Sequence, residues 1–205
     1  MYVQFGCGWS APPSWENFDA SPTLRFERIP IIGRLYTKNA QRFPENVRYG
    51  DIVRGLPIPL DSCDGIYCSH VLEHLALSDA DVALKNTFQY LRSGRIFRLV
   101  VPDLRQLAQS YLLDPSSESA HRFMKDACLG QEQRSRSIVG FARQLLGNSA
   151  HLWMWDEAAM AAKLSKHGFV EIRRAQFGDS DDNRFDEVED KDRFDRCLGM
   201  QCKKA

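Results

Sequence analysis

The sequence has no excess of charge of either sign, because its 205 residues include 27 Lys and Arg and 27 Asp and Glu. A neutral chain has no general attraction to nucleic acid or to an anionic membrane surface, so we expect neither as a partner. Its apolar runs stay far below the roughly 20 residues that span a bilayer, and Met1 leads directly into a strand-like segment instead of a signal sequence. We therefore expect a cytoplasmic protein whose ligand is a small molecule.

Paired cysteines and internal repeats are also missing. The six cysteines form neither a CxxC pair nor a zinc-ligand spacing, which predicts reduced and mostly buried thiols. A chain of this length suits one domain with a substantial core better than two. The prediction is a single domain over residues 1–205, present as a monomer or a homodimer.

A short apolar segment that runs into polar side chains is the most informative feature of the chain. It reads DGIYCSHVLEHL over residues 64–75, and its far end, from Ser69 onward, carries ionisable and hydroxyl side chains. Because an open α/β sheet binds ligands beyond the carboxyl ends of its strands, residues from Ser69 onward should face the ligand.

Strand-like and helix-like segments alternate along most of the chain. Strands are expected at 2–5, 17–19, 46–52, 64–69, 95–101, 169–177 and 197–203, and helices at 78–91, 104–112 and 156–168 and as two short pieces within 22–44. This alternation predicts an α/β fold with a mostly parallel, doubly wound sheet. Pro12 and Pro13 exclude a regular helix between the first two strands, so the first crossover helix should be shortened or missing.

Glycines and acids stand at the ends of the first three strands. Gly6 and Gly8 allow a sharp turn close to a ligand, which suggests a nucleotide, although the third glycine of a dinucleotide fingerprint is missing. That gap argues against a nicotinamide-dependent oxidoreductase. Asp19 ends the second strand and Asp51 the third; capping of the next helix by Asp19 and a turn role for Asp51 are their structural interpretations.

Three segments carry a family resemblance: FGCG at 5–8, DGIYCSHVLEHL at 64–75 and GRIFRLVVPDL at 94–104. Together they resemble the class I S-adenosylmethionine-dependent methyltransferases, particularly the small type 11 branch, and the resemblance covers residues 3–113 well. It implies a Rossmann-like sheet of seven strands in the order 3-2-1-4-5-7-6, with the last strand antiparallel. It also implies S-adenosylmethionine as cofactor and S-adenosylhomocysteine as product.

The resemblance places a cofactor site at the ends of the first four strands. The glycine-rich loop would lie beside the methionine and ribose, and Asp19 would bind both ribose hydroxyls with its two acceptor oxygens. Asp51 and Ile52 would recognise the adenine. The implied cofactor-binding residues are Phe5, Gly6, Cys7, Gly8, Asp19, Ala20, Asp51, Ile52, Ser69 and His70.

Histidines are the candidate catalytic residues. A methyl group on a sulfonium is already activated, so a general base helps only where the attacking atom must lose a proton. The candidates are His70, His74 and His151, each with a hydrogen-bonded structural role as its alternative. Helical spacing predicts that His70 and His74 share one face while Glu73 points elsewhere. The HxxEH order is also similar to a zinc peptidase motif, but no third ligand is evident in the sequence, so we expect no metal.

Residues 114–150 interrupt the alternation of strands and helices. They predict a helical insertion with one helix at 120–129 and another ending near Gly147, and we expect it to act as a lid that selects the acceptor. Arg134, Arg136 and Arg143 would suit a carboxylate or phosphate on that acceptor, although a solvated helix face explains any one of them. The charged run at 179–196 predicts a solvated loop or exposed helix.

The expected function is transfer of a methyl group from S-adenosylmethionine to an oxygen or nitrogen of a small-molecule acceptor. The non-enzymatic alternative is a methyltransferase-like binding module in which the shortened first crossover has weakened the cofactor site. Fold alone does not separate the two.

Overall fold

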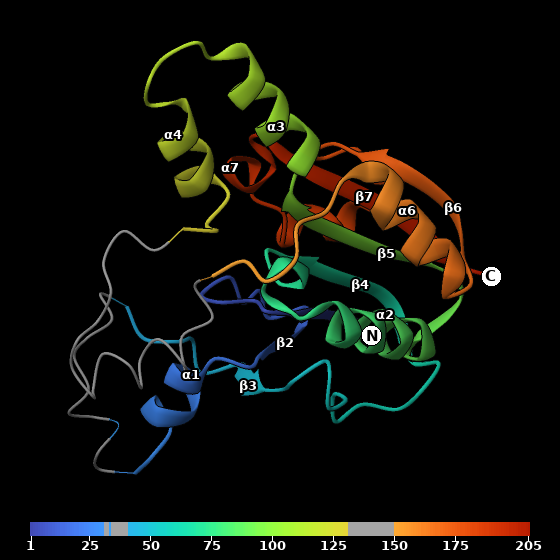
Figure 1. Cartoon of the computed structure of the whole chain (residues 1–205). Coiled ribbons are helices and arrows are strands. Elements are labelled where there is room, and N and C mark those ends of the chain that lie inside the picture. The colour runs from blue at the N-terminus through green and yellow to red at the C-terminus, as the bar shows by residue number, and fades with distance from the viewer. Residues whose placement is uncertain (31–32, 34–40, 131–149) are drawn as a thin grey trace.

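The sheet of the computed structural model has seven strands in the order β3-β2-β1-β4-β5-β7-β6 (Figure 1). The structure describes residues 1–30, 33, 41–130 and 150–205. The strands are β1 (Tyr2–Phe5), β2 (Glu16–Asp19), β3 (Val47–Tyr49), β4 (Cys63–Ser69), β5 (Leu91–Pro102), β6 (Phe169–Ala175) and β7 (Cys197–Lys204). The first five strands pair in parallel, whereas β7 runs antiparallel to both β5 and β6. The predicted order and the antiparallel last strand are therefore confirmed.

Helices follow most of the strands, as the alternation predicts. They are α1 (Pro22–Glu27), the 3₁₀ helix η2 (Leu72–His74), α2 (Leu77–Tyr90), α3 (Leu104–Leu113), α4 (Ser119–Asp126), α6 (Glu157–Lys166), the 3₁₀ helix η3 (Asn183–Glu187) and α7 (Lys191–Phe194). Asp103 and Asp156 cap α3 and α6 by accepting backbone N–H groups of the first turn, which stabilises both starts. Each helix described here is too short or too polar to cross a membrane.

The central strands are buried on both faces, which explains their continuous apolar sequences. On one face α2 and α6 contribute Leu84, Met160 and Leu164 to the main core (Figure 1). On the other face Trp15 and Phe185 pack against Tyr67 of β4 in a second core cluster. The sheet therefore has a covering layer on each side, as a doubly wound fold requires.

The first crossover is a loop, as Pro12 and Pro13 predict. Residues 6–15 form turns, and two buried amides organise them. Gln4 donates to the Ser10 carbonyl at 2.7 Å and to the Asn17 side chain at 2.6 Å, and Asn17 donates to the carbonyls of Pro12 and Trp15. These side-chain hydrogen bonds satisfy backbone carbonyls that would be paired within the backbone if this crossover were a helix.

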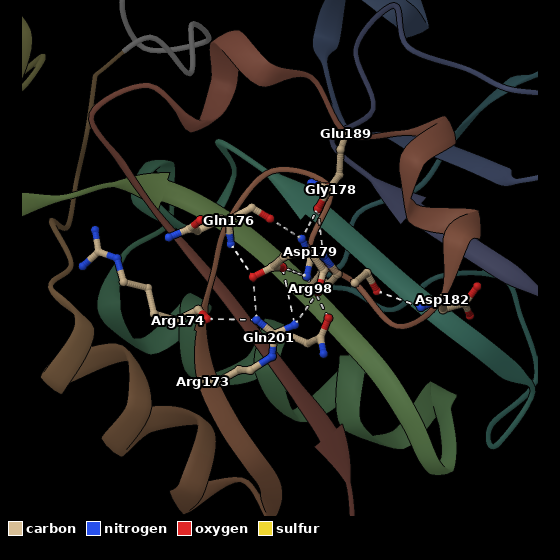
Figure 2. A network of polar contacts seen from close by, with 10 residues as sticks. Arg98, Arg173, Arg174, Gln176, Gly178, Asp179, Asp182, Glu189 and Gln201 are labelled. Carbon is tan, nitrogen blue, oxygen red and sulfur yellow. Dashed lines mark hydrogen bonds and ion pairs between the residues drawn. The ribbon is translucent and has the colours of Figure 1, made fainter.

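The charged run at 179–196 is mostly exposed, as predicted, and α7 within it has no buried residue, but part of the run is held against the sheet. Its Glu189 lies against Arg98 of β5 at 2.5 Å, and both side chains are at most 1% exposed (Figure 2). Arg98 also pairs with Asp179 at 2.9 Å and donates to Gln201 of β7 at 2.7 Å. Because a buried arginine requires compensating acceptors, this network fixes the run onto the sheet.

Parts of the predicted insertion lie among the described residues. Helix α4 confirms the helix expected at 120–129, whereas the second helix, the three arginines at 134, 136 and 143 and most of the second piece within 22–44 lie outside the described residues. All six cysteines are free thiols, and four of them are buried, as expected.

Candidate functional site

A cavity of about 370 Å³ lies beyond the carboxyl ends of β1, β2, β3 and β4. This is the place where open α/β sheets bind ligands, and its size is in the range of small-molecule sites. The lining residues are Phe5, Gly6, Asp19, Ala20, Ser21, Pro22, Thr23, Gly50, Asp51, Ile52, His70, Val71, His74 and Leu75. Segments far apart in the sequence thus meet at one edge of the sheet.

Gly6 is required where β1 turns into the cavity. Its φ is +67°, and a Cβ atom built there would lie 2.2 Å from Cγ2 of Val71. Any side chain would therefore combine an unfavourable backbone conformation with a direct clash. The absence of a side chain lets the loop after β1 pack closely against the segment after β4.

Asp19 joins the loops that follow β1 and β2. Its side chain is largely buried, and its Oδ2 accepts the Gly8 N–H at 3.0 Å while Oδ1 accepts the Ser21 N–H at 2.7 Å. Ser21 is the actual N-cap of α1, so Asp19 supports the cap instead of providing it. A carboxylate oxygen can accept more than one hydrogen bond, so both oxygens keep capacity for a ligand hydroxyl.

Asp51 and Ile52 line the cavity at the end of β3. Asp51 Oδ1 accepts the Val53 N–H at 2.9 Å, which is the turn role, and its position in the lining leaves the adenine role open as well. The two interpretations of this residue are therefore compatible.

Three residues of the predicted cofactor set lie beside the cavity and not in its lining. They are Cys7, Gly8 and Ser69. Burial raises the pKa of the Cys7 thiol to about 12, so it stays protonated, and Gly8 acts through its N–H on Asp19. Sequence reasoning missed Val71 and Leu75, although both stand in the segment that it singled out.

The segment after β4 is a 3₁₀ turn and not an α-helix, so the predicted placement of Glu73 is wrong. His70 adopts a left-handed backbone conformation with φ +55°, and η2 follows from Leu72. In consequence Glu73 turns inward, is 0% exposed, and places Oε1 3.1 Å from His70 Nδ1 and 4.0 Å from His74 Nε2. The two histidines and the carboxylate converge.

The two cavity histidines have different surroundings. Burial would lower the pKa of His70, but contacts with Cys197 and Glu73 and the charge of Glu73 raise it to about 10. His70 is therefore a cation at neutral pH and is poorly suited to accept a proton. His74 donates from Nδ1 to the Ala150 carbonyl at 3.1 Å, which leaves a lone pair on Nε2.

His151 joins this cluster through backbone contacts. The N–H groups of Leu152 and Trp153 both donate to the Glu73 carbonyl, at 2.7 and 3.1 Å. The His151 ring consequently lies 5.0 Å from the His74 ring, centroid to centroid. Burial lowers the pKa of His151, which keeps it neutral at neutral pH.

Comparison with known proteins shows likeness in structure only: no family model and no curated protein matches the sequence. A Thermotoga maritima S-adenosylmethionine-dependent methyltransferase has a TM-score of 0.55 at 15% identity, covering 100% of this chain and 82% of that chain. An Archaeoglobus fulgidus S-adenosylmethionine-dependent methyltransferase has a TM-score of 0.51 at 13% identity, covering 99% and 85%. A chain in the complex of the Haloferax volcanii Trm112 methyltransferase activator with a methyltransferase has a TM-score of 0.50 at 16% identity, covering 98% and 81%.

This chain has the class I methyltransferase fold. Within that fold the cavity lies at the topological switch point between β1 and β4. From this point β2 and β3 extend the sheet to one side, and β5 extends it to the other. The methyltransferase fold here lacks a first crossover helix, and turns that end at Trp15 take its place in the chain.

Proposed function

We propose that this protein transfers a methyl group from S-adenosylmethionine to a small-molecule acceptor. The observation that carries the proposal is the convergence of Gly6, Asp19, Asp51 and His70 on one cavity at the carboxyl edge of a methyltransferase-type sheet. The cofactor supplies an activated methyl group, so the chain's own task is to hold the two reactants and exclude water. Assignment to the type 11 branch stays a prediction.

The lining residues suit the parts of the cofactor. Asp19, at the end of β2, offers oxygens to the ribose hydroxyls. Asp51 and Ile52, after the neighbouring strand β3, are placed to contact the adenine. Gly6 leaves room for close approach of a ligand to the backbone. The apolar side chains of Val71 and Leu75 help to exclude water from the same space.

Proton removal from the acceptor would fall to the histidine cluster. His74 lines the cavity, and because its Nδ1 donates to the Ala150 carbonyl, Nε2 is the ring nitrogen left to accept a proton. His70 is protonated at neutral pH. We therefore assign His74, and not His70, the part of the catalytic prediction that requires a base. The positive charge of His70 is paired with the Glu73 carboxylate 3.1 Å away, so His70 helps to hold this part of the cavity wall in place.

One observation favours the non-catalytic alternative. Both oxygens of Asp19 already accept backbone N–H groups, which weakens their attraction for ribose hydroxyls compared with an uncommitted carboxylate. In that case the chain would be a binding module with the same fold and a weakened cofactor site.

Calorimetry with S-adenosylmethionine, S-adenosylhomocysteine and NAD in parallel tests the proposal. We expect both sulfur nucleosides to bind and NAD to give no heat. Binding of NAD alone would contradict the proposal, and so would the absence of binding by all three. Transfer of the methyl group from bound S-adenosylmethionine to a member of a panel of hydroxyl and amine compounds, with release of S-adenosylhomocysteine, would indicate the enzyme. Binding without transfer to any of them would indicate the binding module.

A further inference from the structure

Three potential ligand side chains meet beside the cavity. One ligand atom from each of Glu73, His74 and His151 lies within 4.8 Å of the other two. Seventy-seven positions separate the second and third of them in the chain, so the sequence alone offers no reason to group them. The first two belong to η2, and the third precedes α6.

Glu73 is buried without adequate compensation. Its side chain is 0% exposed, and neither carboxylate oxygen has a hydrogen-bond partner among the described residues. His70 Nδ1 lies 3.1 Å from Oε1 as an ion-pair partner, which offsets the charge on one side only. Burying a carboxylate costs several kcal/mol unless it is paired and hydrogen-bonded, so a cation beside the second oxygen would remove a real penalty.

One ring nitrogen of each histidine lies in the same small space as a carboxylate oxygen of Glu73. The Nδ1–H of His74 is held by the Ala150 carbonyl, which orients the ring and directs Nε2 toward Glu73. His151 Nδ1 is buried and also lacks a hydrogen-bond partner among the described residues. Backbone carbonyls that fix the far nitrogen of an imidazole are the usual outer support of a metal-binding histidine.

We propose that Glu73, His74 and His151 bind one divalent metal ion of the zinc type. Two imidazoles and one carboxylate form a donor set that zinc and neighbouring transition metals prefer, whereas Mg²⁺ and Ca²⁺ prefer oxygen ligands. Three protein ligands also leave a coordination position open for water or a substrate.

The geometry needs only small side-chain adjustments. Ligand atoms at about 2.0–2.2 Å from a zinc ion are roughly 3.5 Å apart, so rotations that move atoms by about 1 Å close the present spacing. The backbone that carries the ligands is already fixed, because Leu152 and Trp153 donate to the Glu73 carbonyl. His74 lines the cavity, which gives the ion an access route.

The open position would face the acceptor, and this consequence rests on the proposed function. A hydroxyl group bound to the ion would lose its proton more easily, because a divalent cation lowers the pKa of a bound oxygen. The ion would then use the Nε2 lone pair of His74, so His74 would act as a ligand and not as the base. The proton of the bound hydroxyl would pass to water.

The test is metal binding by the full chain, without any activity measurement. Protein stripped with EDTA is titrated with Co²⁺ followed by visible absorption, and with Zn²⁺ and Mg²⁺ followed by calorimetry. We expect one equivalent of Co²⁺ or Zn²⁺ to bind with the spectrum of a low-coordinate nitrogen and oxygen site, and no heat from Mg²⁺. His151→Ala and Glu73→Gln should abolish this binding, and His121→Ala, whose side chain is 84% exposed on α4, should leave it unchanged.

Two results would overturn the proposal: a wild-type protein that binds neither ion, or a His151→Ala variant that binds as the wild type does. If a variant fails to fold, the wild-type melting temperature decides, because an ion that binds only the native state must raise it and EDTA must reverse the rise. Calorimetry with S-adenosylhomocysteine on the stripped protein keeps the two proposals apart. Nucleoside binding without metal binding would refute the metal site alone, and the reverse result would refute the proposed function alone.

Discussion

Asp19 is the residue on which the nucleoside assignment depends most. We expect Asp19→Ala to weaken S-adenosylhomocysteine binding by roughly 1.5–3 kcal/mol, the range for a hydrogen bond to a charged group, as measured by calorimetry. The exposed Asp181 supplies the control, and Asp181→Ala should bind as the wild type does. Because Asp19 also holds Gly8 and Ser21, circular dichroism must show that the variant is folded. Unchanged affinity in a folded Asp19→Ala protein would remove the ribose assignment.

Alanine substitutions at Gly6 and Gly94 distinguish the cost of a steric clash from the cost of a left-handed backbone conformation. Both have positive φ, at +67° and +73°, but a Cβ at Gly6 meets Val71 whereas one at Gly94 meets nothing within 4 Å among the described residues. Gly94→Ala should cost about 1–2 kcal/mol of stability for its backbone alone. Gly6→Ala should cost about 1–3 kcal/mol more and should also weaken nucleoside binding. Equal losses in urea denaturation would show that the contact with Val71 is unimportant.

Sequence reasoning identified Gly6, Asp19 and Asp51 because turn glycines and strand-ending acids are local patterns. It misplaced Glu73 because it extended helical spacing across His70, whose left-handed backbone rotates the next residues into a 3₁₀ turn. It did not group His151 with Glu73 and His74, because His151 is brought there by the hydrogen bonds of Leu152 and Trp153 to the Glu73 carbonyl, a contact that no spacing rule contains.

The segment between β6 and β7 is anchored by its buried ion pair with β5. Glu189→Ala leaves Arg98 buried with one fewer carboxylate, so we expect a loss of about 3 kcal/mol in the free energy of unfolding. Glu16→Ala breaks an exposed pair with Arg48, where the side chains are 44% and 53% exposed, and should cost less than about 1 kcal/mol. Denaturation midpoints that fall equally in both variants would contradict the anchoring role.

Asp179, in the same segment, should contribute to the free energy of unfolding in a way that is lost in acid. Burial would raise its pKa, but Arg173, the Gln176 N–H and Arg98 together lower it to about 2. A carboxyl group whose pKa is lower in the native state stabilises it above the unfolded pKa of about 3.9, and this stability is lost as the pH falls toward 2.

Asp179→Asn should therefore lose about 1 kcal/mol at pH 7, after allowance for solvent screening of a side chain that is one-third exposed. Its deficit relative to the wild type should shrink between about pH 4 and pH 2. Urea unfolding at several pH values measures this, with Asp181→Asn as the control that should follow the wild type throughout. A deficit that does not change with pH would show that the charge of Asp179 does not stabilise the fold.

The first crossover and the charged run show what could be predicted for single elements. Adjacent prolines are a local signal, and they correctly predicted the loop at 6–15. The exposure of most of the charged run was predicted, but its buried contact was not, because the partner of Glu189 is Arg98, which lies 91 positions away on β5. Composition indicated solvation and could not identify Glu189 as a side chain that a tertiary contact buries.

For the whole molecule, the order of elements along the chain and the family resemblance together predicted the sheet correctly. Parallel strands joined by right-handed crossovers leave few arrangements, and the antiparallel β7 follows from the resemblance. The shape of the cavity could not be predicted to the same degree, because it depends on side chains from four strand ends at once. A lid role for residues 114–150 stays a prediction, and hydrogen exchange with and without S-adenosylhomocysteine would test it.

The most direct test of the account is a crystal structure of the protein with S-adenosylhomocysteine. We expect the ribose hydroxyls against Asp19, the adenine beside Asp51 and Ile52, and the sulfur directed toward His70 and His74 in the cavity beyond β1 to β4. A nucleoside bound at any other surface, or crystals grown at saturating nucleoside with water alone in this cavity, would contradict it.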